Sequence, residues 1–143
     1  MPELESVVDQ TVRIAAPPEV VFEYFVDPRK LVSWIGSRAD LDATPGGRFW
    51  VDMNGRDVAA GEYVEIEPPK RVVFTWGWEK GGPPVAPGAS TVEVTLTLDG
   101  DHTVVRLIHR GLPQPFLESH EAGWTEHFAT LVALGEQGRL TAG

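Results

Sequence analysis

The chain contains no cysteine, which excludes disulfide scaffolds, thiolate nucleophiles, cysteine-ligated zinc and iron–sulfur clusters. It also lacks any stretch that approaches the roughly 18–20 consecutive apolar residues of a membrane-spanning helix. The acidic start, MPELESVVDQ, has no apolar run behind a basic segment and does not resemble a secretory signal. We therefore expect a cytoplasmic protein that does not enter a membrane.

Positive charge is also scarce. The chain has 12 Lys and Arg against 21 Asp and Glu, a formal net charge of −9. Such an excess repels phosphate, so neither nucleic acid nor an anionic membrane surface is expected as a partner. Phosphate-binding and dinucleotide-binding loops are missing, and the HEAGW segment at His120 lacks the second histidine of a zincin motif. The sequence therefore implies no cofactor and no metal.

The chain is rich in apolar residues, and its length suits a single domain. The chain has 143 residues, of which 42% are hydrophobic, and a chain of this size buries roughly two-thirds of its unfolded surface. No internal repeat or low-complexity tract divides it, so we expect a single domain over residues 1–143. The abundance of Gly, Ala, Val and Pro suits a GC-rich bacterial genome.

The first quarter of the chain predicts a strand followed by two short helices. Apolar residues of one parity within 6–15 indicate the strand. Pro18 can open the first helix, because the first helical position needs no backbone donor. Asp27 followed by Pro28 is typical of a cap and the first residue of a second helix, which Gly36 ends.

The middle of the chain has a period of two, which is typical of strands. Asn54-Gly55 and Asp99-Gly100 are strong hairpin turn signals between such strands. The strands predicted in this way cover residues 37–43, 49–53, 58–67, 71–79, 91–98 and 103–110.

A long helix is predicted at residues 117–136. Trp124, Phe128, Leu131 and Gly135 are spaced so that they form one stripe on it. A run of strands followed by a helix indicates an α+β fold, with an antiparallel sheet covered on one face.

The order of several longer motifs is informative. The first is VRIAAPPEVVFEYFVDPRKLVSWIG, the central ones are PGGRF and GEYVEIEPPKRVVFTWGW, and the last are IHRGLP and HEAGWTEHFATL. Together they resemble the SRPBCC superfamily of START lipid-transfer and birch-pollen-allergen-like proteins. Within it they resemble the bacterial branch called heat-shock-protein-90 ATPase activator-like, over about residues 8–137.

This resemblance implies a helix-grip fold, in which a curved antiparallel sheet of six to seven strands wraps around the long C-terminal helix. It also implies a cavity between the sheet and the helix. Members of the superfamily bind apolar or amphipathic small molecules, and some catalyse cyclisation or hydration. In the cochaperone that gives the branch its name, the related domain contacts a chaperone.

Aromatic side chains are the main candidates for the lining of this cavity. They lie on one strand, on a short helix and on the closing helix, and they converge in the proposed fold. Large flat rings line pockets at low entropic cost, although they can equally fill a core. The candidate ligand-binding residues are Trp34, Phe49, Val51, Met53, Phe74, Trp76, Trp78, Val94, Leu96, Leu107, His109, His120, Trp124 and Phe128.

Three histidines and one glycine of this region have several interpretations. His109 shares the parity of the inward residues of its strand, and His120 and His127 lie on one helix face with Trp124. An inward histidine donates to a ligand, acts as an acid or base, or simply binds a backbone group. Gly123 lies inside the long helix, where glycine costs about 1 kcal/mol relative to alanine. Close packing, space for a ligand or sequence drift would explain it.

Four further side chains have the outward parity of their strands. Tyr63, Glu65 and Glu93 are therefore expected to face solvent or a partner, and Trp50 is expected to be exposed and to offer a surface contact.

Three functions are consistent with these observations. The first, which we favour, is a carrier or sensor of a hydrophobic small molecule. The second is a protein-interaction module, either cochaperone-like or a homodimer. The third is a cyclase- or hydratase-type enzyme, which needs an inward polar pair, for example His109 with Tyr63 or a Glu. Strand parity places such a pair on opposite faces unless a bulge intervenes.

Overall fold

The protein is built from one sheet, one long helix and three short helical segments. A computed structural model describes residues 7–142, so the part of the predicted first strand at residue 6 lies outside it. The elements in chain order are β1 (Val8–Ile14), α1 (Pro18–Val26), α2 (Pro28–Leu31), β2 (Arg38–Leu41), β3 (Arg48–Asp52), β4 (Val58–Glu67), β5 (Arg71–Lys80), β6 (Ser90–Asp99), β7 (His102–Arg110), η1 (Gln114–Phe116) and α3 (Leu117–Glu136).

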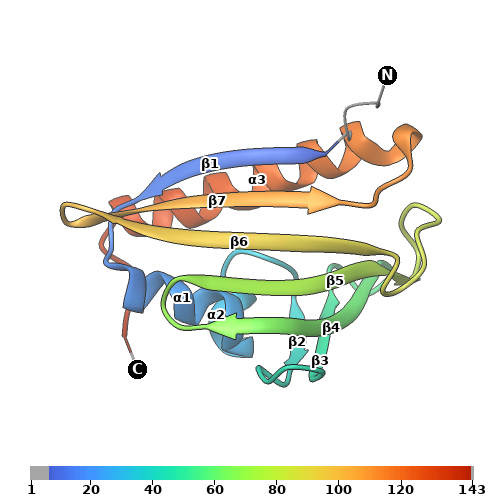
Figure 1. The fold of residues 1–143 in the computed structure, drawn as a ribbon, viewed down its shortest axis with the longest axis horizontal. Helices are drawn as coiled ribbons and strands as arrows, with labels where there is room; N and C mark the ends of the chain where they lie inside the picture. Colours follow the sequence, from blue (N-terminus) through green and yellow to red (C-terminus); the bar gives the residue numbers. More distant parts are fainter. Residues whose placement is uncertain (1–6, 143) are drawn as a thin grey trace.

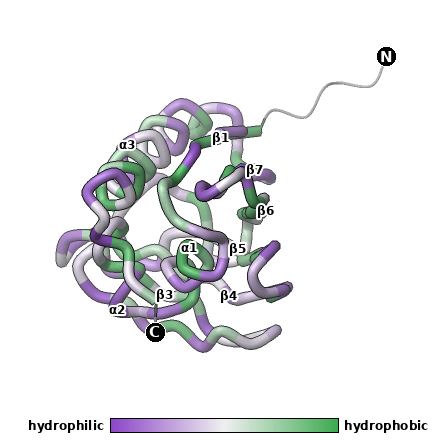
Figure 2. The backbone as a smooth tube through the Cα atoms, turned by 90° about the vertical axis from the view of Figure 1, so that its left-hand side faces the viewer, coloured by the Kyte–Doolittle hydropathy of each residue, from purple (hydrophilic) through white to green (hydrophobic). Residues whose placement is uncertain are grey.

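The seven strands form one antiparallel sheet in the order β1-β7-β6-β5-β4-β3-β2. Strands β2 to β7 form a meander, in which each strand pairs with the next. The last strand, β7, also pairs with the first, β1. Figure 1 shows α3 running alongside β1 and β7, with α1 and α2 at one end of the long strands. In the end-on view of Figure 2 the strands curve around the molecule and α3 lies on the open side of the curve. The predicted α+β helix-grip fold is confirmed.

Helix α3 is fixed to the edge of the sheet as well as to its inner face. Its bounds agree with the predicted range, and the predicted stripe from Trp124 to Gly135 is buried. The Gln10 side-chain amide of β1 donates to the Glu121 carbonyl at 2.8 Å and to Thr125 Oγ1 at 2.9 Å. This polar contact sets the position of the helix along β1. No helix within residues 7–142 is long and apolar enough to cross a membrane.

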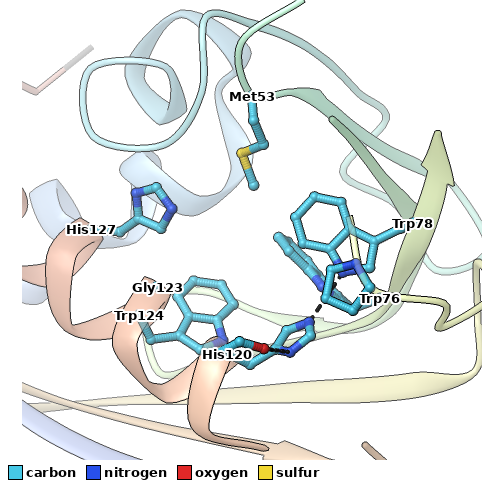
Figure 3. A pocket seen from close by; sticks show the side chains of 9 residues that line it. Met53, Trp76, Trp78, His120, Gly123, Trp124 and His127 are labelled. Carbon is cyan, nitrogen blue, oxygen red and sulfur yellow. Dashed lines mark hydrogen bonds between the residues drawn. The ribbon is translucent and has the colours of Figure 1, made fainter. Parts of the chain in front are cut away.

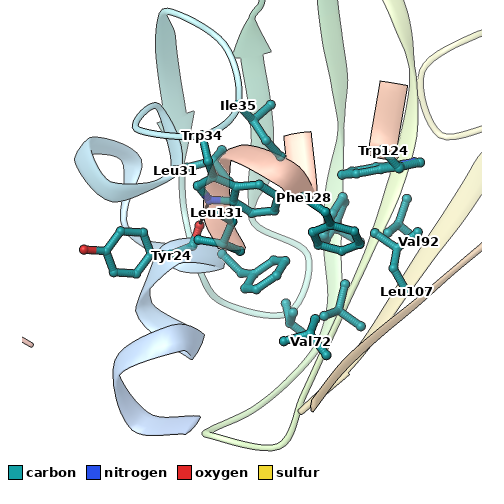
Figure 4. Packing of buried hydrophobic residues seen from close by; sticks show 14 of the residues in the cluster. Tyr24, Leu31, Trp34, Ile35, Val72, Val92, Leu107, Trp124, Phe128 and Leu131 are labelled. Atoms are coloured by element: carbon teal, nitrogen blue, oxygen red, sulfur yellow. Dashed lines mark hydrogen bonds between the residues drawn. The ribbon is translucent and has the colours of Figure 1, made fainter. Parts of the chain in front are cut away.

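The two short helices bind α3 through a stack of aromatic rings (Figure 4). The Trp34 and Phe128 rings are nearly parallel, with centroids 5.7 Å apart, and Phe25 meets Trp34 edge-on at 5.0 Å. The Trp34 indole donates to the Tyr24 carbonyl at 2.9 Å. The second helix is shorter than predicted and ends at Leu31, but its predicted Asp27 cap accepts from the Arg29 amide at 2.9 Å.

Tyr63 does not face solvent, so this prediction is wrong. The side chain is only 1% exposed, and its hydroxyl donates to the Phe25 carbonyl at 2.8 Å. The cause is a bulge in β4: Tyr63 pairs with Phe74, whereas Glu65 pairs with Val73. A bulge adds one residue to a strand and shifts its alternation, which leaves Val64 51% exposed instead.

The outer face of the sheet carries the charged side chains. Glu93 lies there as predicted and accepts from Arg71 at 2.6 Å and from Arg110 at 3.0 Å. Glu65 also accepts from Arg71, at 3.0 Å. Glu65 and Glu93 are therefore both engaged in ion pairs within the chain.

Trp50 also has the outward orientation that was predicted, but it is half-buried instead of exposed. The guanidinium groups of Arg38 and Arg48 lie 5.4 and 5.3 Å from its ring. Cations attract the face of an indole ring in this arrangement, so the two arginines cover much of the ring.

The Tyr63 hydroxyl can be tested by substitution. We expect Tyr63→Phe to lower the free energy of unfolding by about 1–3 kcal/mol, because it leaves a buried carbonyl of α1 without its donor. Urea unfolding measures the change. The neighbouring exposed position is the control, since Val64→Thr should change the free energy by about 0.5 kcal/mol or less. Equal effects of the two substitutions would contradict the assignment.

Candidate functional site

A cavity of about 170 Å³ lies between the first half of α3 and the end of β5 (Figure 3). It is open at one side, next to the loop that joins β5 to β6. The residues that line it are Met53, Trp76, Trp78, Pro83, Ser119, His120, Gly123, Trp124 and His127.

Three tryptophans form most of the wall. The Trp76 and Trp124 rings are 5.3 Å apart, so strand β5 and helix α3 meet at the bottom of the cavity. Trp78 stands at 86° to Trp76 at a distance of 5.5 Å and forms the side. Such rigid flat rings give a cavity a defined shape.

Gly123 leaves space instead of providing a close contact. A Cβ atom built on it would have no neighbouring atom within 4 Å. Of the explanations considered above, close packing is therefore wrong, and a Cβ atom at this position would meet open space beside the cavity.

The loop that follows β5 packs onto Trp78. The Trp78 amide donates to the Val85 carbonyl at 2.7 Å, and the Val85 side chain is buried. Gly82 lies directly against the indole ring, where any Cβ would collide. The loop therefore supports the outer wall and brings Pro83 to the mouth of the cavity.

His120 holds Trp78 in place. The Trp78 Nε1–H donates to His120 Nε2 at 3.1 Å, and His120 Nδ1 is 2.7 Å from the Phe116 carbonyl. An indole nitrogen only donates and a carbonyl only accepts. His120 is therefore neutral, with its proton on Nδ1, and both of its nitrogens are occupied.

His109 holds Trp124 in place in the same way, deeper in the core. Its Nδ1 accepts from Trp124 Nε1–H at 3.1 Å, so its proton is on Nε2, which donates to Ser90 Oγ at 2.8 Å. Ser90 in turn donates to the Trp76 carbonyl at 2.7 Å. His109 is fully buried and its hydrogen bonds are complete.

All three histidines near the cavity favour the neutral form. Burial lowers the pKa of His109 from 6.5 to about 3, with a smaller contribution from His120. Burial also lowers the pKa of His120 and of His127, against the opposing effect of their bonds to backbone carbonyls. His127 Nδ1 lies 3.1 Å from the Trp34 carbonyl. Among the residues that the structure describes, no Asp, Glu, Lys or Arg lines the cavity, so this part of its wall carries no charge near neutral pH.

This chemistry suits binding better than proton transfer. A general base needs a free lone pair within reach of its substrate. Both nitrogens of His109 and His120 are engaged, whereas His127 binds the Trp34 carbonyl through Nδ1 and keeps the lone pair of Nε2. One such base does not make the polar pair that a cyclase or hydratase needs. Within residues 7–142, no group of three or more histidine or acidic side chains is arranged to hold a metal ion.

The structure divides the predicted site residues between the cavity wall and the core. Five of them line the cavity: Met53, Trp76, Trp78, His120 and Trp124. The others are packed in the buried core and do not reach it: Trp34, Phe49, Val51, Phe74, Val94, Leu96, Leu107, His109 and Phe128. The stacked rings of Trp34 and Phe128 fill the space beneath α3, which confines the cavity to one end of the sheet.

Four lining residues were not among the predicted ones. Ser119, Gly123 and His127 recur every four residues on α3, next to the predicted His120 and Trp124. The sequence had indicated Gly123 as space for a ligand and His127 as a neighbour of His120 and Trp124 on one helix face, and the same helical spacing could have identified Ser119. Pro83 belongs to an irregular loop, and no pattern in the sequence places it at the cavity.

Comparison with known proteins agrees with this architecture. Residues 15–136 match the family model described as Activator of Hsp90 ATPase homolog 1-like protein. An AHSA1-like protein from Rhizobium etli, solved by NMR, is 37% identical with a TM-score of 0.72, over 94% of this chain and 84% of that one.

Two further matches extend over only part of the other protein. DynU16, from the dynemicin biosynthetic locus, is 25% identical with a TM-score of 0.80, over 98% of this chain and 51% of its own. A curated but uncharacterised protein of Schizosaccharomyces pombe is 29% identical over 103 residues, which are 68% of this chain. The matched region spans 27% of that relative.

The neutral state of His109 predicts how stability depends on pH. As the pH falls below about 6.5, His109 becomes protonated in the unfolded protein but stays neutral in the folded one. The free energy of unfolding therefore decreases. The expected slope is about 1.4 kcal/mol per pH unit for each such histidine. We expect His109→Gln to flatten the decrease between pH 6.5 and 5, as measured by urea unfolding at several pH values. Equal slopes for the two proteins, at an unchanged m-value, would contradict the assignment.

Proposed function

Since the chain belongs to the family of Activator of Hsp90 ATPase homolog 1-like proteins, as its motifs predicted, we propose that it binds a hydrophobic small molecule in the tryptophan-lined cavity and acts as its carrier or sensor. The observation that carries the proposal is the empty space in front of Gly123, between three tryptophan rings. Ligand pockets are concave and mostly apolar, with a few polar groups that fix orientation.

The fixed geometry of the wall supports this proposal. Trp78 and Trp124 are each hydrogen-bonded to a histidine, so their rings are held open to the cavity. A cavity whose walls are already ordered loses little conformational entropy when a ligand enters. The same bonds occupy His109 and His120, and His127 alone does not provide the polar pair that a cyclase or hydratase needs, which makes that alternative less suitable.

Native mass spectrometry of the purified protein, before and after organic extraction, tests the proposal without any assumption about the ligand. We expect a bound mass that disappears on extraction. The same spectrum measures the predicted homodimer. The cytoplasmic location and bacterial source remain predictions from the sequence.

Substitution of Gly123 provides a sharper test. We expect Gly123→Leu to abolish the bound mass, because the new side chain enters the cavity, while the helix gains up to about 1 kcal/mol from the loss of glycine. The control is Ala122→Leu, which places the same side chain at the adjacent exposed position of α3 and should leave the bound mass unchanged. Loss of ligand in both variants, or in neither, would count against this cavity.

A second candidate function is contact with an Hsp90-type chaperone. The family description names an activator of this chaperone, and Trp50 is a partly exposed aromatic ring on the outer face of the sheet. The two arginines that flank it, Arg38 and Arg48, pair with Asp52 and Asp40. Calorimetric titration with a purified chaperone measures the interaction. We expect Trp50→Ala to weaken any binding, and absence of binding at high chaperone concentration would exclude this function.

A further inference from the structure

The cavity is small for a binding site. Its volume is about 170 Å³, whereas pockets for small molecules usually measure about 300–1,000 Å³. The walls on β5 and α3 are held in place, because Trp76 and Trp124 are buried and Trp78 is bound to His120. A ligand of ordinary size therefore fits only if another side of the cavity moves.

The loop between β5 and β6 borders the cavity, and its second half is firmly attached to the sheet. Figure 1 shows this loop at the right-hand end of the two strands. The Val85 side chain is buried, and its carbonyl accepts from the Trp78 amide at 2.7 Å. The Ala86 carbonyl lies so close to Gly77 that any Cβ there would collide with it. This half of the loop cannot move without breaking these contacts.

The first half of the loop, residues 81–84, is attached by fewer hydrogen bonds. Within residues 7–142, one hydrogen bond joins it to another turn: the Gly82 amide donates to Asp57 Oδ1 at 3.2 Å, which is long and exposed to solvent. Gly82 also rests against the Trp78 ring. Gly81 and Gly82 have positive φ angles of 63° and 64°, and glycine adopts positive and negative φ about equally well. The segment therefore combines a hinge with a weak attachment.

Asp57 connects this segment to a second turn that also borders the cavity. Asp57 lies between β3 and β4, where its Oδ2 accepts from the Asn54 side chain at 3.0 Å. Its carbonyl accepts from the Met53 amide at 2.8 Å. Met53 and Pro83 both line the cavity. One aspartate therefore holds together the two turns that contribute to its wall.

We propose that residues 81–84 form a lid on the cavity, and that the hydrogen bond between Asp57 and Gly82 is the latch that keeps the lid closed while the cavity is empty. A ligand displaces the lid when it binds. The latch then breaks, the chain turns at Gly81, and Pro83 leaves the mouth, so that the cavity gains volume. This inference rests on the proposed function and adds to it the way in which the ligand is admitted.

An introduced thiol measures the opening of the lid without any ligand, because the chain contains no cysteine. Gly123→Cys places the thiol in the open space beside the cavity, where it reacts with the neutral reagent 4,4′-dithiodipyridine when the lid is open. We expect Asp57→Ala to raise the rate of this reaction about fivefold, which is the typical effect of losing one hydrogen bond. The absorbance of the released thiopyridone measures the rate.

Two controls assign the effect to the latch. Asn54→Ala removes the other side-chain bond of the Asp57 carboxylate and leaves its bond to Gly82, so it should change the rate by about twofold or less. Ala122→Cys places a thiol at the exposed position next to Gly123. This thiol should react at the same rate with and without the Asp57 substitution.

Binding of a neutral dye tests the lid independently. N-Phenyl-1-naphthylamine fluoresces in apolar surroundings, so a fluorescence titration measures its affinity. A ligand that must first break the latch binds more weakly by the fraction of protein with an open lid. We therefore expect Asp57→Ala to bind the dye up to about fivefold more tightly than the unsubstituted protein, although the substitution removes a side chain.

The possible outcomes separate the lid from the proposed function. The lid is overturned if Asp57→Ala leaves the thiol rate unchanged, if Asn54→Ala raises it equally, or if the Gly123→Cys thiol reacts as fast as the Ala122→Cys thiol while Asp57 is present. Weaker dye binding by Asp57→Ala also overturns it, and in each of these cases the cavity stays a binding site. Failure of the dye to bind, together with no bound mass in the native spectrum, overturns the proposed function, and the thiol rates still decide on the lid.

Discussion

The region around the cavity depends on two hydrogen bonds that each join an indole N–H group to a neutral imidazole ring. Tryptophan contributes much apolar surface, but its nitrogen must find an acceptor when it is buried. Strands and helices have already used most backbone carbonyls, and a carboxylate would bring a charge into the core. A neutral histidine accepts at one nitrogen and passes its own proton to a further acceptor. Trp124 and Trp78 use His109 and His120 in this way.

These pairs also connect the two layers of the fold. His109 belongs to β7 and Trp124 to α3, whereas Trp78 belongs to β5 and His120 to α3. Each bond therefore ties the first half of the helix to a different strand across the cavity. Further along α3, apolar contacts replace them, and the Phe128 ring stacks on Trp34 without leaving space. The polar pairs therefore join α3 to the sheet, and the stacked rings join it to the turn that follows α2.

Much of the fold could be predicted from the sequence, because local patterns determine it. The stripe from Trp124 to Gly135 indicates one helix face, and the Asn54-Gly55 and Asp99-Gly100 turns separate strands in the predicted order. The bulge that buries Tyr63 depends on its pairing with β5, which no spacing within β4 records. For this reason the alternation of residues along β4 predicted the wrong orientation for Tyr63.

The division of aromatic residues between core and cavity was not predictable for a related reason. Phe74, Trp76 and Trp78 alternate on one strand and share the inward parity, yet Phe74 stacks on Phe49 at 4.2 Å and fills the core. Only the two tryptophans nearer the end of β5 reach the cavity. Which ring meets empty space depends on the distance between the sheet and α3 at each point. That distance is set by contacts between residues far apart in the chain, such as Gln10 with Thr125.

The same pairs make the state of the cavity depend on the state of the histidines. If His120 gained a proton, its Nε2 would become a donor and could no longer accept from Trp78, so the side wall would lose its anchor. Burial opposes that proton by lowering the pKa of His120. The uncharged character of the cavity and the fixed position of its wall therefore have one physical cause, which is the cost of a buried charge. A wall built in this way favours a neutral occupant and keeps its shape while the cavity is empty.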